Sequence, residues 1–356
     1  MTATPLIDAA PRQTWDIFCQ VVDNWGDLGV CWRLATQLAE QRQTVRLWVD
    51  DPEPLTWMAP DHRLKADIEV RHWPRTSANA MPPKLQPGNV LIEAFGCDIP
   101  PLWVNALLPP QGVWINLEYL SAEPFVERCH KLPSPVLSGP LAGRQKWFFY
   151  PGFTPKTGGL LGLGALSSSP AVCSTPPTQG DTAHTPKITL FCYEPAALPN
   201  LLGQPGLALA EWRVAAGRTQ QAFDLARHHL PNTTSQLQLP HLSQTEFDQL
   251  LATSDVNFVR GEDSLVRALW AGKPFVWQIY PQTDNAHHGK LEAFLDWLNA
   301  PTSWRHFHRV WNGVVKAPLP PLLWQEWQAC AQQARQRLLQ QDDLVTQLVR
   351  FVSEKR

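Results

Sequence analysis

Two short stretches combine carboxylates with glycines in a way that suits ligand binding. The first is Asp23-Asn-Trp-Gly-Asp-Leu-Gly29, and the second is Arg260-Gly-Glu-Asp-Ser264. Each follows an apolar, strand-like run and precedes a helical pattern. Free N–H groups at a helix start favour an anion such as phosphate. Both stretches are therefore candidate ligand-binding turns.

Each turn also has a purely structural interpretation. Asp23 and Asp27 could cap the turn and the helix that follows. Glu262 could simply be a carboxylate that the helix dipole favours, whereas Arg260 would supply a delocalised cation for a phosphate. The glycine spacing is not G-x-G-x-x-G, so the dinucleotide-binding fingerprint is absent.

Two further motifs are weaker. The loop Tyr280–Gly289 contains adjacent histidines, which rarely face one metal ion together, and the cysteines form no zinc-like cluster. We therefore expect no metal site. Phe191 and Tyr193 alternate along a predicted strand, where they could stack on a nucleobase or belong to the core.

The elements around these motifs predict an α/β fold. An apolar run at 15–22, a helical pattern at 30–41 and a strand at 45–49 form a βαβ unit, which implies a parallel sheet. A second α/β segment starts at 187, and in it a strand at 255–259 precedes a helix at 265–270. Ligands bind at the carboxyl ends of such strands, so the sequence predicts two Rossmann-like domains that face each other across a central cleft.

The domain division follows from composition. We predict an N-terminal domain at 1–186 and a C-terminal, nucleotide-sugar-binding domain at 187–339. Residues 154–186 are rich in Gly, Ser, Thr and Pro, so we interpret about 157–185 as a mobile loop at the domain junction. Its start, TGGLL, could equally be an ordered backbone turn near a ligand. A C-terminal helix at about 340–356 could pack back on the first domain.

Composition excludes several classes of protein. The chain has 356 residues, with 30 Lys and Arg against 32 Asp and Glu. This composition lacks the excess of positive charge that is typical of proteins that bind nucleic acid or an anionic membrane. The 7 cysteines are scattered, as in reduced proteins. No signal peptide and no run of about 18 apolar residues is present. We expect a soluble, cytoplasmic protein.

Long stretches of the chain resemble one family, the bacterial protein-arginine rhamnosyltransferases that modify translation elongation factor P (the EarP family). The resemblance rests on DIFCQVVDNWGDLGVCWRLATQLA, INLEYLSAE, FFYPGFTPKTGGLL and NFVRGEDSLVRALWAGKPFVWQIYPQTDNAHHGKLEAFLDW. It implies a GT-B fold, elongation factor P as protein acceptor, and an inverting, metal-independent transfer from dTDP-β-L-rhamnose without a cofactor.

The resemblance also assigns roles by position. Asp27 corresponds to the catalytic base, Asp23 to its partner and Glu262 to a second essential carboxylate. The remaining matched positions, expected to contact the donor, are Asn24, Trp25, Gly26, Phe191, Tyr193, Gln244, Arg260, Gly261, Asp263 and Ser264.

On this interpretation the acceptor is an arginine guanidinium, which is protonated and therefore a poor nucleophile. A carboxylate pair could orient it by charge-assisted hydrogen bonds and accept a proton as the new bond forms. Three alternatives stay open: a nucleotide-sugar epimerase, a GT-B glycosyltransferase with another donor or acceptor, and a binding protein in which the first turn only caps a helix.

Overall fold

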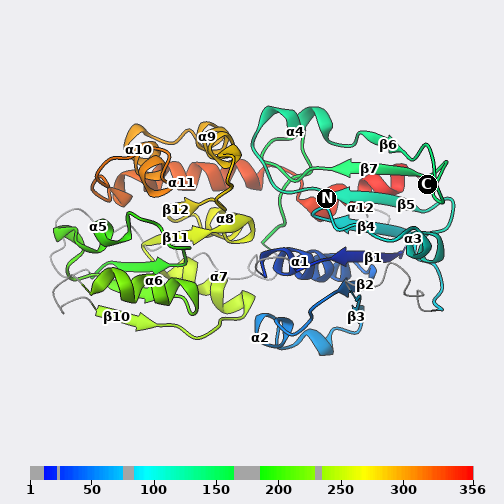
Figure 1. The fold of residues 1–356 in the computed structure, drawn as a ribbon, viewed down its shortest axis with the longest axis horizontal. Helices are drawn as coiled ribbons and strands as arrows, with labels where there is room; N and C mark the ends of the chain where they lie inside the picture. The colour runs from blue at the N-terminus through cyan, green and yellow to red at the C-terminus, as the bar shows by residue number, and fades with distance from the viewer. Residues whose placement is uncertain (1–11, 22–24, 75–83, 164–184, 229–234, 356) are drawn as a thin grey trace, which may run out of the picture.

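The computed structural model describes residues 12–21, 25–74, 84–163, 185–228 and 235–355. In these residues the chain forms two α/β lobes that lie side by side (Figure 1). Each lobe is built on its own sheet, as buried parallel strands separated by helices require.

The first sheet has the strand order β3-β2-β1-β4-β5-β7-β6. All its neighbours pair in parallel except the edge strand β6, which is antiparallel to β7. The strands are β1 Thr14–Cys19, β2 Thr44–Val49, β3 Ile68–His72, β4 Val90–Ala94, β5 Val113–Leu117, β6 Pro133–Pro135 and β7 Gln145–Phe149.

The second sheet is parallel throughout, in the order β10-β9-β8-β11-β12. Counted within its lobe, this repeats the order 3-2-1-4-5 of the first sheet. Both sheets therefore have a topological switch point beside their first strand, where ligands of α/β proteins bind. The strands are β8 Lys187–Leu190, β9 Glu211–Val214, β10 Ser235–Gln238, β11 Val256–Arg260 and β12 Phe275–Gln278.

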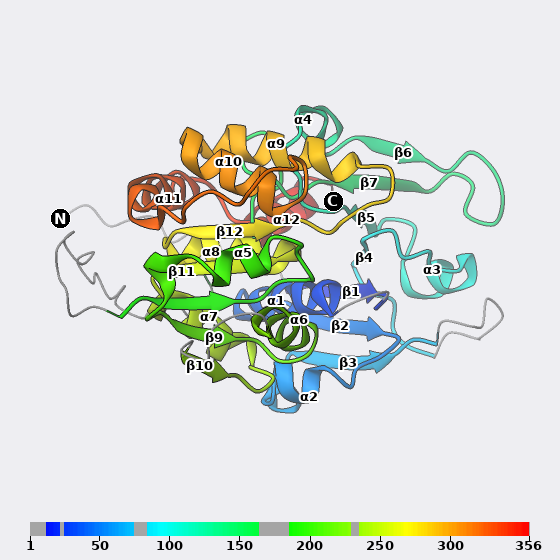
Figure 2. The same cartoon turned by 60° about the vertical axis from the view of Figure 1, so that its left-hand side comes forward.

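Helices cover both sheets (Figure 2). Those of the first lobe are α1 Gly26–Glu40, α2 Leu55–Met58, α3 Pro101–Leu107 and α4 Pro124–Cys129. Those of the second are α5 Leu198–Leu202, α6 Arg218–Arg227, α7 Gln244–Thr253, α8 Gly261–Ala271, α9 Ala286–Leu298, α10 Thr302–Trp311 and α11 Trp324–Leu339.

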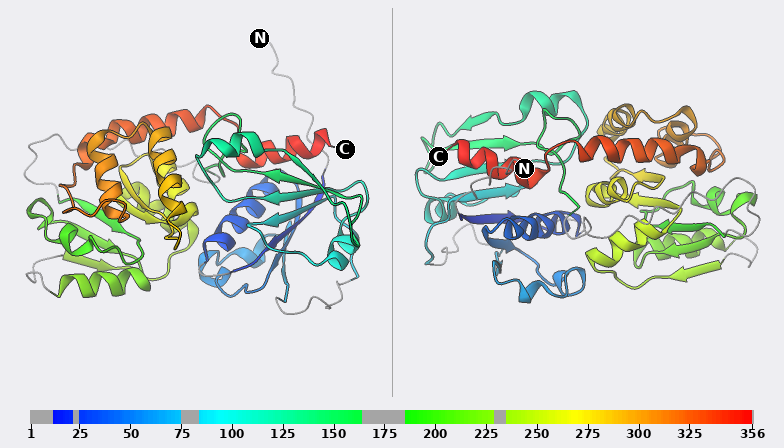
Figure 3. Two further views of the ribbon diagram at one scale, coloured as in Figure 1. Left: turned by 45° about the horizontal axis from the view of Figure 1, so that its top comes forward. Right: turned by 180° about the vertical axis from the view of Figure 1, so that it is seen from behind.

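The C-terminal helix α12, Leu344–Glu354, returns to the first lobe. Figure 3 shows α11 along one lobe and α12 along the other. The apolar face of α12, including Leu348 and Phe351, belongs to the same buried cluster as β1 and α1. The chain therefore crosses between the lobes a second time after α11.

Three sequence-based boundaries were wrong. Helix α1 begins at Gly26 rather than 30, because its buried face already includes Leu28. Helix α8 begins at Gly261 rather than 265, because a φ of 70° at this glycine turns β11 directly into the helix. Strand β8 ends at Leu190, so Phe191 and Tyr193 lie beyond its carboxyl end.

The first part of the stretch interpreted as a loop, residues 157–163, is packed between the two lobes. Leu160 and Leu161 are buried between the lobes. Their backbone is also hydrogen-bonded, since Trp270 Nε1 donates to Leu161 O and Leu344 N donates to Leu160 O. The apolar side chains in this glycine-rich stretch supply the burial that holds it. Residues 164–184 of the predicted loop lie outside the described residues.

Candidate active site

The turn after β1 presents Asp27 at the start of a helix. Asp27 is the second residue of α1, and the preceding Trp25 occupies the N-cap position without a side-chain capping bond. The ring of Trp25 meets those of Trp57 and His241 edge-on, at centroid distances of 5.2 and 5.9 Å. The predicted site residues Asp23 and Asn24 lie outside the described residues.

The turn after β11 has the same construction. Glu262 is the second residue of α8, as Asp27 is of α1. Arg260 occupies the N-cap position and makes no side-chain capping bond, and the Ser264 hydroxyl donates to Arg260 O. The N–H groups of this helix start therefore have no side-chain cap, as an anion site needs.

The two turns meet through the segment that follows β5. Tyr119 OH donates to Asp27 Oδ2 over 3.2 Å, and Leu120 N donates to Glu262 Oε2 over 2.8 Å. Two consecutive residues of one segment thus reach both carboxylates. Helices α1 and α8 also pack against each other. The structure therefore brings Asp27 and Glu262, which are far apart in sequence, to one place between the lobes.

The surroundings of Asp27 suit a base that works near neutral pH. Burial raises the pKa of Asp27 to about 7, the negative charge of Glu262 contributes to the rise, and the hydrogen bond from Tyr119 opposes it. Within the described residues Asp27 has no ion-pair partner. A carboxylate with a pKa near 7 can both lose and accept a proton under physiological conditions.

Glu262 has different neighbours. Its Oε1 forms an ion pair with Lys290 Nζ of α9, and its Oε2 accepts the bond from Leu120 N described above. Both carboxylate oxygens are thus held, one from each lobe. About a fifth of each side chain is exposed, 20% for Lys290 and 23% for Glu262, so the pair borders solvent.

Aromatic rings surround Arg260, the residue before α8. The Arg260 guanidinium lies 4.5 Å from the ring centre of Phe191 and 4.7 Å from that of Tyr193, and its Nη1 donates to Cys192 O. Next to it, a cavity of about 280 Å³ opens at the carboxyl ends of β8 and β12, with Tyr193, Tyr280 and Arg218 in its wall. The structure thus gathers predicted donor-contacting residues around one cation and one cavity.

Gln244 and Asp263 lie at the contact between the lobes. Gln244 Nε2 donates to Gly29 O, and Asp263 Oδ1 lies 3.3 Å from Arg33 Nε. A donor role for these two predicted residues stays a prediction.

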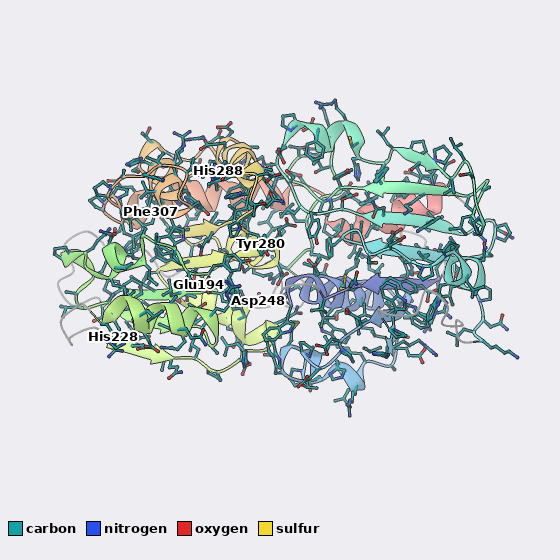
Figure 4. The ribbon with its side chains drawn as sticks, viewed as in Figure 1. Glu194, His228, Asp248, Tyr280, His288 and Phe307 are labelled. Atoms are coloured by element: carbon teal, nitrogen blue, oxygen red, sulfur yellow. The ribbon has the colours of Figure 1, made fainter. Side chains whose placement is uncertain are left out.

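A buried ion cluster, made of Asp248, Arg33 and Arg267, also connects the two lobes. Asp248 accepts from Arg267 of its own lobe over 2.7 and 2.8 Å and from Arg33 of the other lobe over 3.1 and 3.3 Å. In Figure 4 Asp248 lies where the lobes meet. Because it is 5% exposed, its charge depends on these partners.

Sequence reasoning missed Tyr119 and Lys290 as site residues. Tyr119 follows a predicted buried strand at the same sheet edge as Asp27, and this position is a signal that could have found it. Lys290 lies one turn into α9, where a lysine is normally a solvated surface residue. Only the fold reveals that it pairs with Glu262.

The described residues contain no group of three or more His, Cys, Asp or Glu side chains arranged to hold a metal ion. None of the helices within them is long and apolar enough for a membrane span.

The fold and the site together define a class of protein. Two Rossmann-like lobes with candidate residues at facing strand ends are the GT-B arrangement of glycosyltransferases. The solved structure of Acinetobacter baumannii MurG shares this fold, with a TM-score of 0.51, 12% sequence identity, and coverage of 97% of this chain and 100% of that chain.

Family membership is more specific. The family model for Elongation-Factor P (EF-P) rhamnosyltransferase EarP matches residues 15–353. A protein-arginine rhamnosyltransferase of Pseudomonas putida is 41% identical over 96% of this chain and 98% of its own length. A solved structure described as the basis of EarP-mediated arginine glycosylation of EF-P matches with a TM-score of 0.59 and 28% identity, covering 96% of this chain and 99% of that chain. The chain belongs to the EarP family, and the resemblance seen in the sequence is confirmed.

Proposed function

We propose that this glycosyltransferase moves L-rhamnose from dTDP-β-L-rhamnose to an arginine side chain of translation elongation factor P, with inversion and without a metal ion. Family membership supports the acceptor and the sugar. The observation that carries the chemistry is the meeting of Asp27 and Glu262 between the lobes, bridged by Tyr119 and Leu120. We also propose a cytoplasmic location, because the acceptor is a translation factor.

On the donor side, the start of α8 is suited to the diphosphate. Its first N–H groups lack a side-chain cap, and Arg260 lies beside them between two aromatic rings. As the bond from C1 of the sugar to the diphosphate oxygen breaks, negative charge grows on the leaving dTDP. A helix N-terminus and a guanidinium can stabilise that charge without a metal ion.

On the acceptor side, Asp27 addresses the low nucleophilicity of a protonated guanidinium. Its carboxylate binds the cation and directs one terminal nitrogen toward C1. The C–N bond forms as the C–O bond breaks, and the proton that the nitrogen loses passes to Asp27. Attack on the face opposite dTDP converts the β-L-sugar into an α-L-rhamnosyl-arginine. Glu262 is assigned to the sugar hydroxyls or to the positive charge that develops on the ring.

Intact-mass analysis of elongation factor P tests the proposal. Incubation with the enzyme and dTDP-β-L-rhamnose should add one deoxyhexose, and fragmentation should locate it on arginine. NMR of the product should show the α anomer, and EDTA should leave the rate unchanged.

The control reactions distinguish the alternatives. A nucleotide-sugar epimerase would convert the donor without any acceptor, and another donor specificity would appear as a mass gain only with a different nucleotide sugar. A binding protein would give no product with any donor. Any of these results would overturn the proposal.

A further inference from the structure

We infer that Lys290 is a positioning residue for catalysis: its ion pair with Glu262 fixes that carboxylate in place, and Asp27 is left as the carboxylate that accepts the proton. The inference rests on the proposed function of the same site. It concerns a residue outside both acidic turns.

The geometry of Glu262 supports this role. Lys290 approaches Oε1 from α9, while the backbone N–H of Leu120 holds Oε2 from the other lobe. With one donor on each oxygen, the carboxylate plane is fixed. A side chain held in this way connects the second lobe to the segment that carries Tyr119.

The contrast with Asp27 supports it as well. Both carboxylates lie in the first turn of a helix, where the dipole favours negative charge. Among the described residues Glu262 has a cation and Asp27 has none, only the Tyr119 hydroxyl. The negative charge of Glu262 contributes to the raised pKa of Asp27, so the cation paired with Glu262 belongs to the electrostatic surroundings of the proton acceptor.

Several other ionisable groups surround the pair. Asp27 of α1 and Tyr119 after β5 both experience the charge of Glu262, as does Tyr193 beyond β8. Glu123, at the start of α4, lies near Gly289, the neighbour of Lys290 on α9. Two of the surrounding groups carry positive charge. Arg260, at the N-cap of α8, lies over the rings of Phe191 and Tyr193, whereas Lys290 forms the ion pair with Glu262. Removal of Lys290 therefore takes away the cation that is paired with this carboxylate.

The test replaces Lys290 by methionine and by arginine and follows kcat/KM for transfer to elongation factor P from pH 6 to 9.5. In K290M the apparent pKa on the acid side of the pH–rate profile should rise by about one unit, because the negative charge of Glu262, which raises the pKa of Asp27, is no longer offset by an adjacent cation. If the apparent pKa of the wild-type profile is about 7, as the pKa of Asp27 indicates, kcat/KM of K290M at pH 7 should be about fivefold lower than that of wild type. The difference should disappear above about pH 9. In K290R the charge is retained, so the profile should stay near that of wild type.

Controls separate this inference from simpler effects. K65M removes an exposed lysine elsewhere on the first lobe and should leave the profile unchanged. Thermal unfolding of each variant reports on folding. A K290M profile that falls equally at all pH values would mean a structural role only, and an unchanged profile would mean no role. Either result overturns the inference. If wild type itself transfers no sugar, the proposed function fails instead.

Discussion

The turns after β1 and β11 are alike in their backbone positions and different in their neighbours. Each follows a strand at the switch point of a parallel sheet, and each places a carboxylate second in the next helix. Their neighbours differ: Tyr119 hydroxyl contacts Asp27, whereas Lys290 and a backbone N–H hold Glu262. Equal backbone positions thus acquire different acid–base properties from side chains that arrive from other elements.

The difference also explains why the site needs both lobes. Asp27 belongs to the first lobe and Glu262 to the second, yet Glu262 contributes to the raised pKa of Asp27. An isolated first lobe would lack that charge, and its Asp27 would be a weaker base. The buried cluster of Asp248, Arg33 and Arg267 joins the two lobes beside the helices that carry these carboxylates.

Removal of the Asp27 charge is expected to have the largest effect. In D27N the side chain keeps its size and can still accept a hydrogen bond from Tyr119, but it cannot take up the guanidinium proton. We expect kcat to fall by about 10²–10⁴-fold, the usual contribution of a general base.

Donor binding separates a chemical loss from a structural one in D27N. Calorimetric titration with dTDP-β-L-rhamnose should give a Kd near that of wild type. D61N, at an exposed position of the first lobe, should be fully active. Transfer by D27N within tenfold of wild type would remove Asp27 from the role of base.

Neutralising the other carboxylate should change the pH profile in the opposite direction to K290M. In E262Q the negative charge that raises the pKa of Asp27 is gone, so that pKa falls and the acid limb moves to lower pH. The plateau rate should fall by about 10–100-fold, since the charge-assisted contact to Lys290 is also lost. An acid limb that stays in place or moves upward would show that the two carboxylates are not coupled.

Loss of the Tyr119 hydroxyl is expected to have a smaller effect. Its hydrogen bond lowers the pKa of Asp27, so Y119F should raise this pKa and move the acid limb to higher pH. A net contribution of about 0.5–1.5 kcal/mol for one hydrogen bond corresponds to about a two- to tenfold loss at pH 7. The phenyl ring can keep the stack on Phe95, whose ring centre lies 4.9 Å away, so thermal stability should change little. A pH profile identical to that of wild type would argue against the bond.

Much of this arrangement could be predicted from the chain alone. Asp27 and Glu262 could be placed at strand ends because apolar runs precede them and helical patterns follow. Their meeting could also be expected, since the carboxyl ends of both sheets face a cleft in this fold.

The interactions that give the two carboxylates different roles could not be predicted. Lys290 pairs with a residue 28 positions away, and Arg33 with one 215 positions away. Charged side chains on helices normally point to solvent, so the sequence around Lys290 and Arg33 does not indicate these contacts. The burial of Leu160 and Leu161 was obscured by the glycines and serines around them.

The smallest expected effect concerns the backbone of the second turn. Gly261 has a φ of 70°, a conformation that costs a residue with a Cβ about 1–2 kcal/mol. The space itself is sufficient, because a Cβ would lie 3.7 Å from Tyr193 OH, an ordinary contact. G261A should therefore lower the free energy of unfolding by about that amount in urea denaturation.

A second glycine provides the matched control. Gly289 lies inside α9 with room for a methyl group, 3.9 Å from Glu123 Oε1, and its φ is not positive. Alanine there should be neutral or stabilise by up to about 1 kcal/mol, because alanine is the better helix former. Equal losses in both variants would mean that added volume, rather than backbone conformation, sets the cost at Gly261. A loss confined to G261A would show that the turn from β11 to α8 requires a glycine with positive φ. The position of Glu262, the next residue, would then depend on that glycine.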